Sequence, residues 1–108
     1  MKQLALMQGQ EVVKHYPLVK DSYSIGRSKD NDLVFEHPKV SRNHARLHFV
    51  GGDVELEDLH STNGTAVNDR PIRGRVVLRS GDRFQVGAVH FKFLHERDPE
   101  HAYHEAIY

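Results

Sequence analysis

The chain is built from short runs in which apolar and polar residues alternate, and this period of two restricts its fold more than any other feature. The clearest run places Ala45, Leu47 and Phe49 on one side, with Arg46 and His48 on the other. A turn at residues 51–53 follows, and a second alternating run occupies residues 54–57. Alternation on both sides of a glycine-containing turn predicts a β-hairpin with one buried face.

Similar runs, separated by turn residues about every ten positions, continue from residue 2 to residue 95, with no helical stripe before residue 98. They are Leu4–Met7, Val12–Leu18, Tyr23–Ile25, Leu33–Phe35, Arg75–Leu78, Phe84–Val86 and Val89–Phe93. Nine or more short strands predict an all-β sandwich. An apolar content of 38% is sufficient for its core, since a strand buries one side chain in two.

Length and composition exclude several classes of protein. A polypeptide of 108 residues is expected to hold one domain. The absence of cysteine excludes a disulfide framework, a thiolate zinc site and a cysteine nucleophile. The first apolar run, residues 4–7, is too short for a signal sequence or a membrane span, so we expect a cytoplasmic protein with no membrane partner.

The charge balance argues against nucleic acid as a partner. Fifteen basic and fifteen acidic residues cancel, so the protein as a whole has no electrostatic attraction for DNA or RNA. The balance is uneven, however: residues 1–93 carry a net charge of +3 and residues 94–108 carry −3.

The pattern changes after Asp98-Pro99, where Ala102, Tyr103, Ala106 and Ile107 recur at helical spacing. This predicts a domain over residues 1–96, followed at 97–108 by a linker or the start of a signalling helix. Such a helix is too short to be stable alone, so we expect it to continue in a longer protein.

Polar residues that suit an anionic ligand gather in loops at the predicted strand ends. They lie at Gly26-Arg27, at residues 41–45, at residues 58–65 and at Val67-Asn68. Guanidinium, hydroxyl and amide groups in loops are the groups that bind a phosphate or a carboxylate.

Three other interpretations of polar residues in this sequence remain. Arg27 alone would be read as half of a surface salt bridge. Ser41, His44 and Asp58 could serve as nucleophile, base and orienting carboxylate, although no Gly-x-Ser-x-Gly elbow surrounds the serine. A histidine pair at 101 and 104, flanked by glutamates, could hold zinc. No phosphate loop or dinucleotide fingerprint is present, which argues against nucleotide chemistry. We favour none of these alternatives and expect no catalytic residue, metal or cofactor.

The loop clusters resemble the forkhead-associated (FHA) domain, in order and spacing, over roughly residues 2–95. The matching blocks are Gly26-Arg27, Ser-Arg-x-His-Ala at 41–45, Leu-x-Ser-Thr-Asn-Gly-Thr at 59–65, Val67-Asn68 and Gly81-Asp82. The resemblance implies a β-sandwich of about eleven strands whose loops bind a phosphothreonine peptide.

The resemblance also implies a role for each matching residue. Arg27 would pair with the phosphate, Ser41 would donate its hydroxyl to it, and Arg42 would add its backbone N–H and guanidinium. Thr62 would shape the phosphothreonine pocket, and Asn63 would hold the peptide backbone. Three residues would position these groups: Gly26, His44 and Gly64.

Two further expectations concern specificity and output. Lys39, in the same loop as Ser41, is expected to read an acidic residue located C-terminal to the phosphothreonine, although a lysine here could equally be a solvated surface residue. Residues 101–108 resemble the connector that leads, in bacterial signalling proteins, from an FHA domain into a GGDEF domain making cyclic di-GMP. That resemblance implies control of a diguanylate cyclase and a homodimer formed through the C-terminal helix. The alternative is a phosphate-independent interaction or dimerisation module on the same fold.

Overall fold

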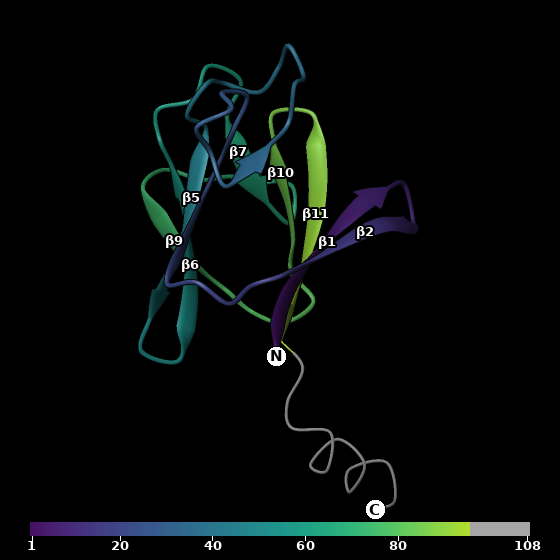
Figure 1. Cartoon of the computed structure of the whole chain (residues 1–108), viewed down its shortest axis with the longest axis vertical. Coiled ribbons are helices and arrows are strands. Elements are labelled where there is room, and N and C mark those ends of the chain that lie inside the picture. Colours follow the sequence, from purple (N-terminus) through teal and green to yellow (C-terminus); the bar gives the residue numbers. More distant parts are fainter. Residues whose placement is uncertain (96–108) are drawn as a thin grey trace, which may run out of the picture.

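The computed structural model describes residues 1–95, which form two β-sheets packed face to face (Figure 1). The six-stranded sheet has the order β2 (Glu11–Pro17), β1 (Lys2–Gln8), β11 (Val89–His95), β10 (Arg83–Val86), β7 (Thr65–Val67) and β8 (Arg70–Pro71). The five-stranded sheet has the order β4 (Leu33–Val34), β3 (Ser22–Gly26), β5 (Ala45–Val50), β6 (Asp53–Asp58) and β9 (Arg75–Leu78). The predicted all-β sandwich of eleven strands is confirmed.

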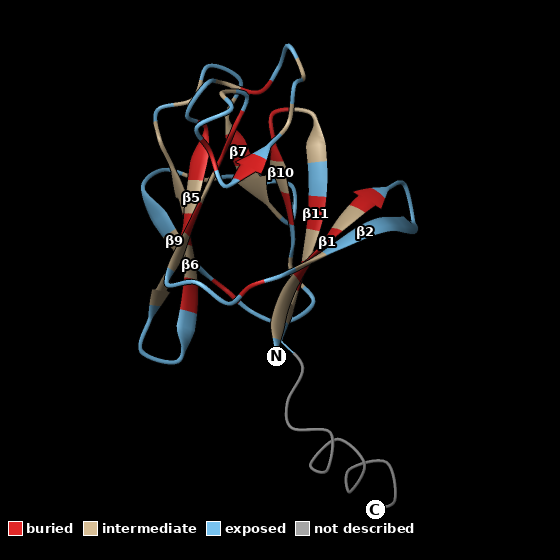
Figure 2. Ribbon diagram, viewed as in Figure 1, coloured by how far each residue is buried: buried red, intermediate tan, exposed pale blue. Residues whose placement is uncertain are grey.

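The core lies between the two sheets and consists of the apolar residues of the alternating runs. Along β5 and β6, Leu47 and Leu56 are opposite one another and both are fully buried. On the facing sheet, the rings of Phe84 and Phe91 stack with centroids 5.0 Å apart, and Phe35 meets Phe91 edge-on at 5.3 Å. Figure 2 shows buried residues alternating with less buried ones along these strands, as a half-buried sheet requires.

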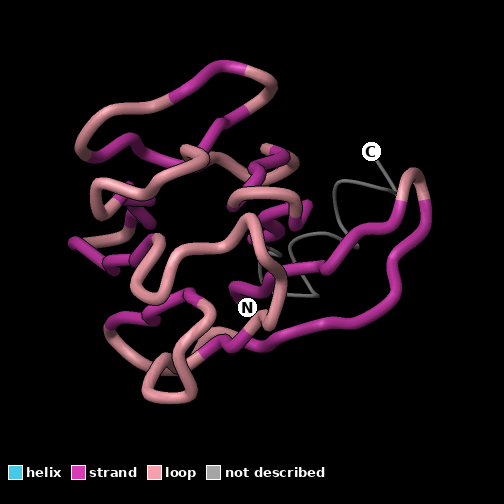
Figure 3. The backbone as a smooth tube through the Cα atoms, turned by 90° about the horizontal axis from the view of Figure 1, so that it is seen from above, coloured by secondary structure: helices cyan, strands magenta, loops and turns pink. Residues whose placement is uncertain are grey.

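The hairpin of β1 and β2 departs from the alternation expected for residues 12–18. It extends away from the rest of the sandwich (Figures 1 and 3), and β2 pairs only with β1. Val12 and Val13 therefore keep 45% and 51% of their surface exposed. A register shift opposite Leu6 and Met7 bends this edge strand, which is a common way to protect a sheet edge from unwanted pairing.

Two short strands, β7 and β8, were not distinguished by the sequence pattern. Asn68 and Asp69, both with positive φ, form the turn between them. Asn63-Gly64, which alone reads as a hairpin turn, instead lies in a crossover, because β6 and β7 belong to different sheets.

The predicted helix near Glu100, the 97–108 linker and the His101/His104 pair lie outside the described residues. Within residues 1–95, no helix has the length and hydrophobicity that a membrane crossing needs.

Candidate functional site

The loops that follow β3, precede β5 and follow β6 meet at the end of the sandwich away from the N-terminus (Figure 1). Backbone hydrogen bonds join the first two loops: Arg27 N–H donates to the Ser41 carbonyl at 2.9 Å, and Ser28 N–H donates to that of Arg42 at 3.2 Å. Arg27 and Ser41, far apart in sequence, are thus adjacent.

The third loop docks on the second through side chains. The backbone N–H of Thr62 donates to Ser41 Oγ at 3.0 Å, and Asn63 Nδ2 donates to the Lys39 carbonyl at 3.1 Å. Because Ser41 Oγ accepts from Thr62, its own proton is available to a ligand. In the same way, Asn63 keeps its amide oxygen Oδ1 to accept a bond from a ligand.

His44 joins these loops from inside the protein. Its side chain is fully buried; Nδ1 accepts a hydrogen bond from Ser41 N–H at 2.9 Å, and Nε2 lies 2.9 Å from the Gly64 carbonyl. Since a carbonyl only accepts, Nε2 carries the proton and donates, and the ring is neutral. Neither ring nitrogen bonds Ser41 Oγ or Asp58, so these three described residues do not form a nucleophile–base–carboxylate arrangement.

Gly26 is required because two loops cross directly over it. A Cβ at this position would lie 2.1 Å from the Arg42 carbonyl oxygen and 2.6 Å from Asn31 Nδ2. Asn31 is buried and donates to the carbonyls of Ser28 and Arg42, at 2.9 and 2.6 Å. The sequence did not single out Asn31 as a supporting residue. It lies in a run of turn-forming residues at 28–32, and this run does not reveal which of its side chains is buried.

Asp58 anchors the base of the third loop. Its carboxylate accepts hydrogen bonds from the hydroxyls of Ser61 and Thr65, at 2.5 and 2.7 Å, and from Ser61 N–H at 3.3 Å. Burial acts to raise the pKa of this carboxyl, but the hydrogen bonds from Ser61 and Thr65 outweigh burial and hold the pKa below its ordinary value. Asp58 therefore supports the loop as a carboxylate.

Gly87, in the turn between β10 and β11, supports the site from the other sheet. Its φ is +58°, a Cβ would lie 2.2 Å from the Lys39 carbonyl oxygen, and its N–H donates to the Gly64 carbonyl at 3.2 Å. The sequence marks Gly87 only as a turn residue, because its contact with the Lys39 loop spans two sheets.

Three cationic residues in these loops have no side-chain partner within residues 1–95. The side chains of Arg27, Lys39 and Arg42 belong to exposed residues, and within residues 1–95 none of them makes a hydrogen bond or an ion pair. Lys20, by contrast, is paired with Asp32. The alternative interpretation of Arg27, as half of a surface salt bridge, is thus not seen within residues 1–95. Three free cations beside a hydroxyl donor suit a compact dianion.

Comparison with known proteins identifies relatives of this arrangement. The FHA domain family model matches residues 23–87. The glycogen accumulation regulator GarA of Mycolicibacterium smegmatis is 34% identical over 91 residues, which cover 84% of this chain and 57% of GarA.

Two solved structures share the fold and about a third of the sequence. One, from a study of phosphothreonine-dependent FHA domain interactions, has a TM-score of 0.80 and 31% identity, covering 90% of this chain and 98% of that one. The other, Mycobacterium tuberculosis EmbR in complex with a low-affinity phosphopeptide, has a TM-score of 0.79 and 33% identity, covering 86% of this chain. The present protein spans 24% of that EmbR structure and 57% of GarA, so it corresponds to part of each relative.

Proposed function

The chain belongs to the FHA domain family, and on that basis we propose that its loop cluster binds a phosphothreonine peptide as a regulatory, non-catalytic module. Arg27 and Arg42 pair with the phosphate, and the Ser41 hydroxyl donates to it. Thr62 shapes the pocket for the phosphorylated residue, and Asn63 holds the peptide backbone.

The observation that carries this proposal is the free hydrogen-bonding capacity at the loops. The Ser41 hydroxyl proton is available, and the adjacent cationic side chains have no partner among residues 1–95. Phosphothreonine supplies about −1.5 to −2 charges and three acceptor oxygens. Two or three charged hydrogen bonds of about 1.5–3 kcal/mol each, less the cost of ordering the peptide, correspond to micromolar affinity.

The phosphothreonine comes from outside these 108 residues. The sequence contains two threonines, Thr62 and Thr65, and both lie in or directly after the third loop. Thr65 is buried with its hydroxyl on Asp58, and Thr62 belongs to the pocket itself. The ligand is therefore a partner protein or another segment of a longer polypeptide.

Calorimetric titration with matched phosphorylated and unphosphorylated threonine peptides, chosen from an oriented library, tests the proposal. We expect measurable binding of the phosphorylated form alone, and a loss of at least tenfold in Arg27→Ala and Asn63→Ala. Arg79→Ala is the control, because this exposed arginine follows β9 at the far end of the sandwich. Equal affinity for both peptides, or indifference to both substitutions, would favour a phosphate-independent interaction module instead.

Lys39 supplies the proposed sequence preference. Its side chain is exposed and unpaired within the described residues, while its carbonyl is fixed by Asn63. An acidic residue a few positions C-terminal to the phosphothreonine would neutralise it. An oriented phosphopeptide library should show an acidic preference in the wild type that Lys39→Ala removes. The same preference in both proteins would assign it to another residue.

We propose that the module controls a cytoplasmic bacterial signalling domain, most specifically a diguanylate cyclase, and that residues 97–108, which lie outside the described residues, link the two and support a homodimer. This step is supported by the resemblance of residues 101–108 to a known connector. The sequence that follows Tyr108 in the parent gene is the first test. If a GGDEF domain follows, cyclic di-GMP synthesis by the full-length protein should change when the phosphopeptide is added.

A further inference from the structure

Charged residues are arranged differently on the outer faces of the two sheets. On the five-stranded sheet, the charges pair with each other across strands: Arg75 lies 3.4 Å from Glu55 and 3.8 Å from Glu57, and His48 lies 2.7 Å from Glu57. Arg46 is directly opposite Glu57 in the register. This face satisfies its own charged groups and presents few free ones to a partner.

The outer face of the six-stranded sheet instead places like charges together. Because Phe84, Phe91 and Phe93 are buried in the core, their neighbours along β10 and β11 point outward. The register sets Arg83 directly opposite Lys92, and neither forms an ion pair within residues 1–95. Like charges in directly opposed positions destabilise a sheet. Without a counter-charge, the two side chains are available to bind an anionic group of a partner.

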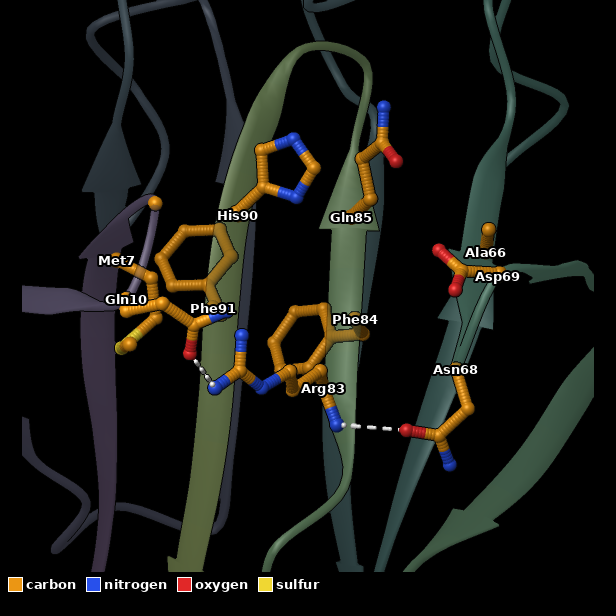
Figure 4. Close-up of a pocket in the computed structure, with 11 residues that line it drawn as sticks. Met7, Gln10, Ala66, Asn68, Asp69, Arg83, Phe84, Gln85, His90 and Phe91 are labelled. Carbon is orange, nitrogen blue, oxygen red and sulfur yellow. Dashed lines mark hydrogen bonds between the residues drawn. The ribbon is translucent and has the colours of Figure 1, made fainter.

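A cavity of about 400 Å³ opens on this face, and Arg83 is one of the residues that line it (Figure 4). Its volume lies within the range of about 300–1,000 Å³ that is usual for ligand pockets. Met7 and Ala66 supply apolar lining, and Gln85 and His90 supply polar lining. His90 is exposed and has no partner among the residues that the structure describes.

The side chain of Arg83 is held in place at this cavity. As Figure 4 shows, it reaches across from β10 to the turn between β1 and β2, where it donates to the side-chain oxygen of Gln10 at 3.0 Å. The Arg83 backbone N–H donates to Asn68 Oδ1, also at 3.0 Å. One guanidinium nitrogen is therefore occupied by a neutral acceptor, and the remaining N–H groups are available.

We propose that this face is a second protein-binding surface, which takes an acidic, unphosphorylated segment of a partner protein. An Asp or Glu carboxylate of the partner binds Arg83 and Lys92, and an adjacent apolar side chain enters the cavity against Met7 and Ala66. Asp69, the carboxylate among the residues that line the cavity, lies on the β7–β8 turn and restricts the acidic residue to the β10–β11 side. The surface shares no residue with the three loops that join at Ser41, although it includes Asn68 of the Val67-Asn68 motif, and it does not depend on phosphothreonine binding.

The test uses a phage-displayed library of random, unphosphorylated dodecamers, selected on the 108-residue protein. We expect enriched peptides to carry Asp or Glu beside an apolar residue. Affinity for a synthetic copy should fall about tenfold or more in Arg83→Gln and in Lys92→Gln. It should also fall in Ala66→Leu, which fills the cavity. Arg75→Gln on the opposite face and Arg27→Ala in the loops should bind like the wild type.

A charge reversal separates this proposal from a structural role for the same residues. Lys92→Glu should raise the melting temperature, because it pairs with Arg83, and should abolish peptide binding. A lower melting temperature or retained binding in this variant would overturn the proposal. So would a library without acidic enrichment, or a selected peptide that Arg27→Ala releases, since that peptide would occupy the loops.

Discussion

Replacing His44 with phenylalanine should damage both the stability of the sandwich and its affinity for phosphothreonine. Phenylalanine keeps a flat ring in this fully buried position and is only slightly larger than histidine, so the main loss is of two hydrogen bonds. Ser41 N–H loses the acceptor Nδ1, and the Gly64 carbonyl keeps its bond from Gly87 N–H. Because only the Ser41 N–H is left without a hydrogen-bond partner, most of the loss of stability and affinity should arise at Ser41.

The expected magnitude follows from those two contacts. A buried donor left without a partner costs about 1–3 kcal/mol, and loss of the second hydrogen bond adds about 1 kcal/mol. The sum, about 2–4 kcal/mol, is below the usual 5–15 kcal/mol stability of a small domain, so the variant should still fold. Its melting temperature should fall by about 10–20 °C.

Urea unfolding followed by far-UV circular dichroism measures the stability, and calorimetry with the phosphothreonine peptide measures the affinity. His44→Asn provides the matched control, because its side-chain oxygen can replace Nδ1 as acceptor for Ser41 N–H. It should recover more affinity than His44→Gln, which can replace the Nε2–H donor instead. A His44→Phe variant with wild-type stability and affinity would refute the reasoning.

Three further outcomes are expected. Gly26→Ala should lower the free energy of unfolding by about 1–3 kcal/mol in urea titrations, because its Cβ collides with the Arg42 carbonyl and no rotamer relieves the collision. Gly87→Ala should weaken phosphothreonine binding in calorimetry, because its Cβ would displace the Lys39 carbonyl that accepts a hydrogen bond from Asn63. Unchanged affinity would show that the loop does not need this support. The lowered pKa of Asp58 stabilises the fold above the ordinary aspartate pKa of about 4, and this contribution is lost as the pH falls through the lowered value. Asp58→Asn should therefore be less stable than the wild type at pH 6, and the difference should shrink toward pH 2.

The sequence predicted the strands well where one face of an alternating run is buried. The runs around Leu47 and Leu56 match β5 and β6 because both strands pack on the core. It predicted less about β2, whose valines are exposed, and about β7 and β8, which are too short to display a period. β7 is placed by its pairing with β10, which is distant in sequence, whereas β2 and β8 are edge strands that pair only with β1 and β7.

The candidate site was predicted from ordered loop motifs, and the loops that carry Arg27, Ser41 and Asn63 do lie together. Val67-Asn68 and Gly81-Asp82 belong to the same motif series but meet each other elsewhere, through the hydrogen bond from Asn68 to Asp82. The supporting groups were harder to find because their roles depend on contacts between distant segments. Asn31 resembles its exposed neighbours in the sequence, yet it is buried between two carbonyls. Gly87 resembles any turn glycine, and only the approach of Lys39 from the other sheet gives it a role.

The convergence of the loops has a consequence for folding. Ser41, Asn63 and Gly87 belong to segments that become neighbours only when both sheets have formed and docked, so the unfolded protein lacks the proposed phosphothreonine site. A ligand that binds only the folded state adds RT ln(1 + [L]/Kd) to its stability, about 2.7 kcal/mol at a hundredfold excess over Kd. On the proposed function, a rise in the concentration of the phosphorylated partner would therefore increase the folded fraction of this domain.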